Sequence, residues 1–173
     1  MPKILLFLGI IIFSSCRSVK YYVVRHAEKE TAVAGTTMST PNDPPLSAAG
    51  RVRAIELREA LRDKGIAYIF STNTVRTIST ARPLDELKGA TRIELYNTKD
   101  SLDQLIQKLK EIKKGNSLIV GHSNTVDDIV NKLCGETKIP KDLPDSEYDN
   151  LYIVTKKGNR YKFENKTYGT PTN

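Results

Sequence analysis

Two histidines, each at the end of an apolar run, are the residues of this 173-residue chain best suited to chemistry. His26 directly follows residues 23–25, and His122 directly follows residues 117–121. The sequence has no other histidine. Such runs are typical of buried strands, and the carboxyl edge of an open α/β sheet is where ligands bind. Because imidazole serves as a nucleophile and as an acid or base near neutral pH, both histidines are candidate catalytic residues.

Two arginines are placed to join them. Arg25 directly precedes His26, and where a strand ends and the backbone turns both side chains can reach one pocket. Arg76 follows a second apolar run, with Thr80 four residues later, so on a helix these two share a face. Guanidinium groups bind phosphate oxygens in bidentate fashion, and they keep a neighbouring imidazole neutral by lowering its pKa. The four residues therefore predict a phosphoryl site in which the arginines supply the positive charge, with no metal or cofactor.

The elements that must position these residues alternate along the chain. Apolar patterns predict strands at residues 21–25, 66–71, 93–96 and 117–121. Helical patterns cover residues 47–64, 73–87, 102–112 and 126–133, with Ser47 as an N-cap and Pro83 bending or restarting the second helix. Residues 152–155 and 161–163 form a predicted hairpin across Gly158-Asn159. We expect an α/β three-layer sandwich: a mostly parallel central sheet, helices on both faces and an antiparallel edge hairpin near the C-terminus.

Two loops are long enough to shape a binding site. Residues 27–45 form a polar loop directly after His26, and loops of this length inside a compact domain are usually functional. Residues 136–150 follow the last predicted helix and carry no regular pattern. We expect both segments to influence specificity.

The N-terminus has the pattern of an export signal. Lys3 precedes an apolar run at residues 4–13, and small residues follow. The run is too short for a membrane-spanning helix, which needs about 20 residues. Cys16 resembles the acylated cysteine of a bacterial lipobox, with Phe13 in place of the usual leucine; the alternative is a chance cysteine beside an ordinary cleavage site. We expect a signal peptide at 1–15, a tether at 16–20 and one domain at 21–168, with Cys16 anchoring an exported lipoprotein to the membrane of a bacterium, facing the periplasm or the exterior.

Composition fits one soluble domain and argues against nucleic acid as a partner. Hydrophobic residues make up 39% and charged residues 27% of the chain, and the formal net charge is +7. The basic residues are dispersed and form no stripe interleaved with aromatic residues, as a nucleic-acid surface would require. An anionic substrate accounts for part of the positive excess. Cys134 follows an apolar helical pattern and is expected to be a small buried hydrophobe. The sequence does not indicate an oligomeric state.

Four motifs resemble those of the histidine phosphatase superfamily, whose fold is called phosphoglycerate mutase-like. In chain order they are Arg-His-Ala-Glu at 25–28, Leu-Ser-x-x-Gly at 46–50, Ser-Thr with a following Arg and Thr-Ala at 71–81, and Gly-His-Ser at 121–123. The resemblance implies that His26 is the phosphorylated nucleophile. It also implies that Arg25, Arg76 and His122 form the phosphate pocket, with His122 stabilising the transition state, while Ser71 and Thr80 have structural roles.

The acid that protonates the leaving group in many members of this superfamily has no clear match. Asp100 is a candidate, although it is equally suited to cap the next helix, and Glu28 is another. The resemblance implies a metal-independent phosphohydrolase that cleaves a phosphorylated small molecule or a phosphoprotein through a phosphohistidine on His26. Two alternatives stay open: a protein-phosphohistidine phosphatase, or a catalytically weak domain that binds phosphate or a phosphoprotein. The chain lacks the insertions of the glycolytic mutases, which argues against a mutase.

Overall fold

Six strands and four helices make up the part of the chain that the structure, a computed structural model, describes: residues 18–31, 42–90, 92–97 and 102–172. The strands are β1 (Val19–Arg25), β2 (Ile66–Thr72), β3 (Ile93–Tyr96), β4 (Asn116–Gly121), β5 (Asn150–Lys157) and β6 (Arg160–Thr167). The helices are α1 (Ala48–Leu61), α2 (Val75–Leu87), α3 (Leu102–Glu111) and α4 (Val126–Cys134).

The strands form one mixed sheet in the order β3-β2-β4-β1-β5-β6. β3, β2, β4 and β1 run parallel to one another. β5 pairs antiparallel with β1 on one side and with β6 on the other. β4 lies in the middle of the sheet and is buried from Ser117 to Gly121, as expected of a parallel strand covered on both faces. The predicted fold class, including the antiparallel edge hairpin, is confirmed.

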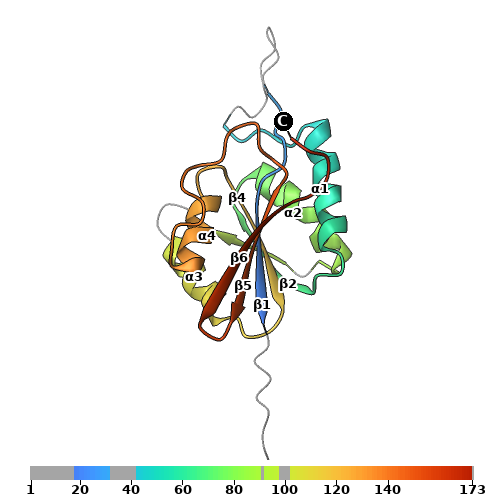
Figure 1. Cartoon of the computed structure of the whole chain (residues 1–173). Helices are drawn as coiled ribbons and strands as arrows, with labels where there is room; N and C mark the ends of the chain where they lie inside the picture. Colours follow the sequence, from blue (N-terminus) through green and yellow to red (C-terminus); the bar gives the residue numbers. More distant parts are fainter. Residues whose placement is uncertain (1–17, 32–41, 91, 98–101, 173) are drawn as a thin grey trace, which may run out of the picture.

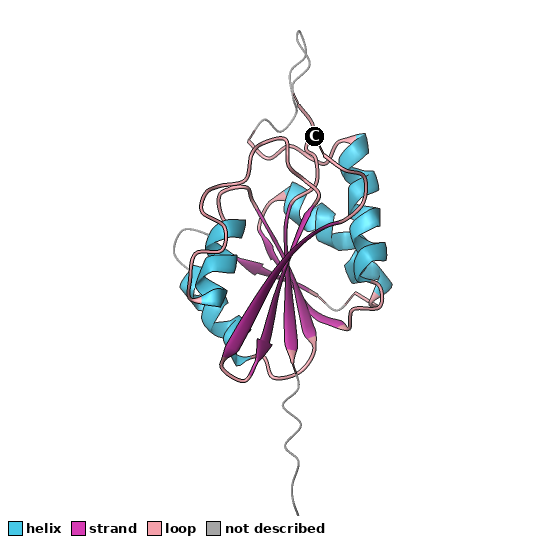
Figure 2. Ribbon diagram, in the orientation of Figure 1, coloured by secondary structure: helices cyan, strands magenta, loops and turns pink. Residues whose placement is uncertain are grey.

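Helices cover both faces of the sheet (Figures 1 and 2). α1 and α2 lie on one face and α3 and α4 on the other. Side chains of β1 alternate between the two faces: Tyr21 and Val23 pack with α3 and α4, whereas Tyr22 and Val24 pack with α1 and α2. Two apolar cores therefore hold the sheet rigid from either side, and the strand ends are fixed relative to one another.

Three predicted boundaries need correction. β1 begins at Val19, because Val19 and Lys20 pair with β5, so the tether predicted at 16–20 overlaps the first strand. α2 continues through Pro83, which excludes the restart but not the bend that the sequence predicted, although proline cannot donate the helical hydrogen bond. The buried Ala81 and Leu84 on either side of Pro83 pack into the core, which holds the helix together there. The chain also stays packed past residue 168: Thr170 bonds to Glu56 of α1.

Several predictions concern residues that the structure does not describe. The signal peptide, Cys16, most of the loop at 27–45 and Asp100 lie wholly or mainly outside the described residues. Within the described part of the chain, no helix is long and apolar enough to cross a membrane. The predicted N-cap of α1 does lie inside it and is confirmed: the Ser47 hydroxyl accepts a hydrogen bond from the Gly50 amide at 3.1 Å.

Candidate active site

The two histidines meet at the carboxyl edge of the parallel strands. β1 and β4 are neighbours with Arg25 opposite Gly121, so His26 and His122 leave the sheet side by side. The His26 amide donates to the Gly121 carbonyl at 2.9 Å, which continues the ladder one residue past the strand. The two imidazole rings lie 5.4 Å apart between centroids, at an interplanar angle of 67°. The structure thus brings together the two residues that the sequence placed at strand ends.

His26 is held in a defined tautomer. Its Nδ1 lies 2.8 Å from the Ala27 carbonyl oxygen, and because a carbonyl only accepts hydrogen bonds, Nδ1 carries the proton. The lone pair of the neutral ring is therefore on Nε2. Burial is the main reason that the pKa of His26 falls to about 3; the bond to Ala27 opposes this, and the positive charges of Arg25 and Arg76 add to it. At neutral pH the ring is uncharged, as a nucleophile must be.

His122 has the opposite tautomer. Its Nδ1 lies 3.4 Å from Nη2 of Arg76, which can only donate, so Nδ1 accepts. Its Nε2 lies 2.9 Å from Oγ1 of Thr72, whose own proton goes to Thr77 at 3.0 Å, so Nε2 carries the proton. Burial and the neighbouring Arg76 and Arg25 lower the pKa of His122 to about 4. The carboxylate of Asp43 opposes the fall.

Arg76 lies in the first turn of α2, and each of its two terminal guanidinium nitrogens has a partner. Its Nη1 donates to Oδ1 of Asp43 at 3.1 Å, and its Nη2 lies against His122. Thr80 has the supporting role expected of it: its Oγ1 donates to the Arg76 carbonyl at 2.8 Å and accepts from the Ala27 amide at 2.9 Å. Thr80 therefore links the first turns of α2 to the backbone that carries His26.

Arg25 is buried and faces the segment between α4 and β5. Its Nη1 donates to the backbone carbonyls of Pro144, Asp145 and Glu147 at 2.9–3.2 Å. Its guanidinium carbon lies 4.2 Å from the centre of the Tyr148 ring, close enough for a cation–π contact. The Tyr148 ring is also 6.1 Å from that of His26. Arg25 thus anchors residues 144–148 beside the histidines, in addition to contributing positive charge.

One nitrogen of each arginine remains available. Nε of Arg25 and Nε of Arg76 are both buried and find no hydrogen-bond acceptor among the described residues. A buried donor without an acceptor is costly, by about 1–3 kcal/mol, and native structures seldom keep one without a reason. Two such N–H groups beside two neutral imidazoles form a site suited to an oxyanion.

Neither candidate proton donor is brought to this site by the described contacts. Glu28 is clamped by Arg53: Nε donates to its two carboxylate oxygens at 2.8 and 2.9 Å, and Nη2 lies 2.7 Å from Oε1. A carboxylate held in this way supports the loop after His26 rather than offering a proton. Asp100 lies outside the described residues. Within those residues, no group of three or more His, Cys, Asp or Glu side chains could hold a metal ion.

Sequence reasoning missed three residues that complete the site: Asp43, Thr72 and Tyr148. Asp43 and Tyr148 lie in loops without a periodic pattern, and their partners Arg76 and Arg25 are 33 and 123 positions away. Only the lengths of the two loops gave a signal. Thr72 was within reach, because it ends β2 in the same way that Gly121 ends β4.

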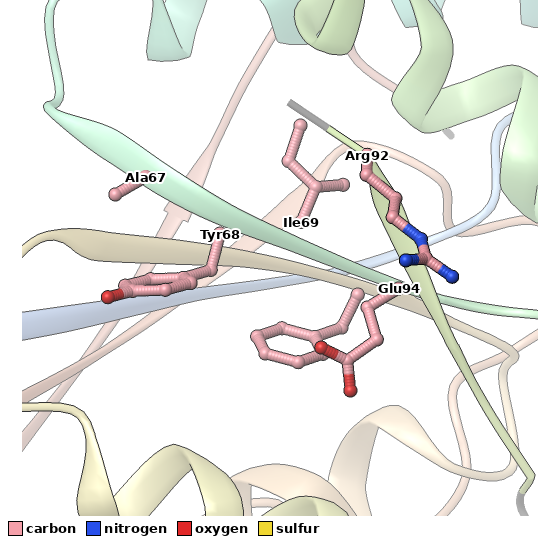
Figure 3. A pocket seen from close by; sticks show the side chains of 6 residues that line it. Ala67, Tyr68, Ile69, Arg92 and Glu94 are labelled. Carbon is pink, nitrogen blue, oxygen red and sulfur yellow. The ribbon is translucent and has the colours of Figure 1, made fainter. Parts of the chain in front are cut away.

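A pocket of about 490 Å³ opens beside His122, at the carboxyl ends of β2 and β3. It is lined by Thr72, Asn73, Thr74, Leu95, Tyr96, Asn97 and His122. A second hollow, of about 420 Å³, lies over the earlier halves of β2 and β3 (Figure 3). Its lining side chains, which include Tyr68, Arg92 and Glu94, comprise none of the site residues. Of these two hollows, the first is therefore the one that borders the histidines.

The chain is similar to known proteins in sequence and in fold. Residues 21–100 match the family model of the histidine phosphatase superfamily (branch 1). The fold is similar to that of a phosphoserine phosphatase from Entamoeba histolytica in complex with 3-phosphoglyceric acid, with a TM-score of 0.63, 12% identity, and coverage of 88% of this chain and 98% of that one.

The fold is also similar to that of SixA of Agrobacterium tumefaciens, described as a proposed phosphohistidine phosphatase. The TM-score is 0.62 at 20% identity, and the alignment covers 88% of this chain and 98% of that one. A protein histidine phosphatase SixA complexed with tungstate gives a TM-score of 0.61 at 16% identity, and the alignment covers 86% of this chain and 96% of that one. At these identities the structures show a shared fold. No curated protein sequence matches the chain.

Proposed function

We propose that this chain, which belongs to the histidine phosphatase superfamily and is a phosphatase, cleaves phosphoesters through a covalent phosphohistidine on His26. The observation that carries the proposal is the pairing of a free lone pair with free donors. Nε2 of the neutral His26 has its lone pair available, and the buried Nε–H groups of Arg25 and Arg76 lack acceptors among the described residues. Nucleophile and charge clamp are thus present in one site.

The proposed reaction has two steps. Nε2 of His26 attacks the phosphorus in line, and the bond from phosphorus to the leaving oxygen breaks with its electron pair remaining on that oxygen, which then takes up a proton. Arg25, Arg76 and His122 bind the equatorial oxygens, where negative charge gathers. In the second step water attacks the phosphohistidine, which releases inorganic phosphate and restores the lone pair. Asp100 stays a candidate for the proton donor of the first step.

The substrate we propose is a phosphorylated small molecule or a phosphoprotein. The pocket beside His122 accommodates a group attached to the phosphate, and its described lining combines hydrogen-bonding side chains with apolar surface such as that of Leu95. A protein-phosphohistidine phosphatase is the second candidate. It is favoured by the similarity in fold to the SixA proteins and by a leaving imidazole that needs little acid catalysis, since the carboxylate of Glu28 is held by Arg53.

Hydrolysis of para-nitrophenyl phosphate tests the proposal, because its good leaving group requires little protonation. We expect the wild type to turn over in the presence of EDTA and His26→Asn to lose at least about 1,000-fold in kcat. A phosphoenzyme that is stable to alkali and labile to acid should form on the wild type and be absent from His26→Asn. Equal labelling of both proteins would show that His26 is not the nucleophile.

His122→Asn is the matched variant. It should still form the phosphoenzyme but more slowly, because it keeps the nucleophile and loses transition-state stabilisation. If all three proteins bind phosphate equally and none hydrolyses either this ester or a phosphohistidine protein, the chain is a binding domain and the proposed activity is wrong.

A further inference from the structure

Asp43 makes a contact that links the loop after β1 to the phosphate site. Both of its carboxylate oxygens accept from the Val75 amide, at 3.1 and 2.9 Å, at the start of α2. Oδ1 also accepts from Nη1 of Arg76 at 3.1 Å. One carboxylate thus caps the helix that carries Arg76 and binds the guanidinium of Arg76 itself, at a place where the helix dipole favours negative charge.

This contact fixes the plane of the Arg76 guanidinium. Asp43 holds one terminal nitrogen and His122 lies against the other, so the group cannot rotate about its long axis without losing both partners. What remains free of acceptors among the described residues is Nε, which is buried. The orientation of the remaining donor is therefore set from outside the pocket, by a residue of the β1–α1 loop.

Asp43 also moderates the charge on His122. The charged groups around this imidazole come from several elements: Arg25 at the end of β1, Arg76 of α2, and Lys29 and Asp43 of the β1–α1 loop, with the neutral His26 beside it. After burial, Arg76, Arg25 and Lys29 lower the pKa of His122, and only Asp43 raises it.

We propose that Asp43 is a positioning residue of the active site, which acts through Arg76 and His122 without touching the substrate. The proposal rests on the proposed phosphatase function for its kinetic consequence, but the contact itself can be tested separately. Asp43 orients the guanidinium of Arg76 for the transition state. Its negative charge also lies close to the bound phosphate and repels it. Removing the charge therefore slows the chemical step while leaving ground-state binding of phosphate unchanged or tighter.

Asp43→Asn is the sharpest test, because the amide oxygen can still cap Val75 while the negative charge that faces Arg76 is lost. With para-nitrophenyl phosphate we expect kcat to fall about 10-fold, since misplaced catalytic groups cost up to about 100-fold. The dissociation constant of inorganic phosphate, measured by calorimetry, should stay equal or decrease. In NMR titrations the apparent pKa of His122 should fall below its wild-type value, because the one group that raises it is gone.

Two further variants separate positioning from stability. Asp43→Glu keeps the charge and should recover part of kcat, and Asp63→Asn, an exposed aspartate at the end of α1, should change neither kcat nor the pKa of His122. An unchanged or higher kcat in Asp43→Asn overturns the proposal, as does loss of phosphate binding in step with a lower melting temperature. If the wild type hydrolyses no phosphoester, the proposed function fails. In that case the role of Asp43 can still be tested without activity: if the pKa of His122 is the same in Asp43→Asn as in the wild type, the role of Asp43 is wrong.

Discussion

The two histidines have the same side chain, and single hydrogen bonds give them different chemistry. The Ala27 carbonyl fixes the proton of His26 on Nδ1, which leaves the lone pair of the ring on Nε2, as the proposed nucleophile requires. Arg76 and Thr72 fix the proton of His122 on Nε2, and this N–H is donated to Thr72. Burial and two arginines keep both rings neutral in the free protein. The position of the proton on each ring therefore depends on the groups that are hydrogen-bonded to its nitrogens, and not on the histidine itself.

Neutral burial of both histidines makes the stability of the fold depend on pH. The pKa of His26 is lowered to about 3 and that of His122 to about 4, from an unfolded value of 6.5. As pH falls below about 6.5 the unfolded chain binds protons that the folded chain does not, so the free energy of unfolding decreases. The loss approaches 1.4 kcal/mol per pH unit for each histidine and continues down to the folded pKa.

Urea unfolding at pH 7 and pH 5 measures this loss. We expect the decrease between the two pH values to be smaller in His26→Asn than in the wild type, because asparagine does not titrate. His122→Asn should also give a smaller decrease than the wild type, and the variant with both substitutions should give the smallest of all. An identical decrease in all of these proteins would mean that the histidines are not buried in neutral form.

At the scale of elements, the site depends on how closely α1 approaches the backbone that follows His26. The Ser47 amide donates to the Glu28 carbonyl at 2.9 Å, and Lys29 bridges to Leu46. A Cβ atom at Gly50 would lie 2.1 Å from that same Glu28 oxygen. Only glycine allows this approach, so the Leu-Ser-x-x-Gly motif is a packing requirement for the loop that holds His26.

Gly50→Ala should therefore disturb both stability and activity. The methyl group pushes α1 away from Glu28, at a cost of about 1–3 kcal/mol in the free energy of unfolding. The shift of residues 27–28 moves His26 and should lower kcat on para-nitrophenyl phosphate by at least about 10-fold.

Gly135→Ala at the end of α4 is the control for Gly50→Ala. Its backbone φ of 72° makes alanine strained there, but a Cβ would meet no atom within 4 Å. Gly135→Ala should lose stability and keep kcat. A Gly50→Ala protein with wild-type kcat would contradict the packing role.

At the scale of the whole molecule, the C-terminal residues 168–172 connect parts of the site that are distant in sequence. The carbonyls of Tyr168 and Thr170 accept from Arg53, the residue that clamps Glu28. Thr172 accepts from the Tyr148 amide at 3.2 Å and bonds to the carboxylate of Asp149. This C-terminal strap lies near the end of the sheet that carries the histidines (Figure 1). It thus ties the loop after His26 to the segment that anchors Arg25.

Thr172→Val should weaken the strap where it meets Tyr148. It removes the hydroxyl and preserves the shape of the side chain, so we expect a loss of about 1 kcal/mol in stability and a rise in KM, because Tyr148 and Arg25 are held less firmly. Thr170→Val is the matched variant: its hydroxyl bonds to Glu56 on α1, so it should lose stability without the rise in KM. Equal KM values in the two variants would contradict a link between the strap and Arg25.

Local patterns in the sequence were sufficient for most of the architecture. Strands and helices alternate with clear apolar periodicity, and this alternation alone leads to a parallel sheet with helices on both faces. The prediction fails where tertiary pairing overrides the local pattern: β1 begins at Val19 because β5 pairs with it. The catalytic candidates could be named because strand ends and residue types are local features.

What the sequence determined by itself is therefore the fold class and the four residues at its edge: Arg25, His26, Arg76 and His122. Only the tertiary structure decided which imidazole nitrogen is free, which arginine nitrogens lack acceptors, and that Glu28 is held by Arg53. The physical reason is that protonation and orientation depend on contacts between residues far apart in the chain, such as Asp43 with Arg76 and Arg25 with residues 144–148. Loops that follow no period bring these partners together, and no local pattern encodes where a loop ends.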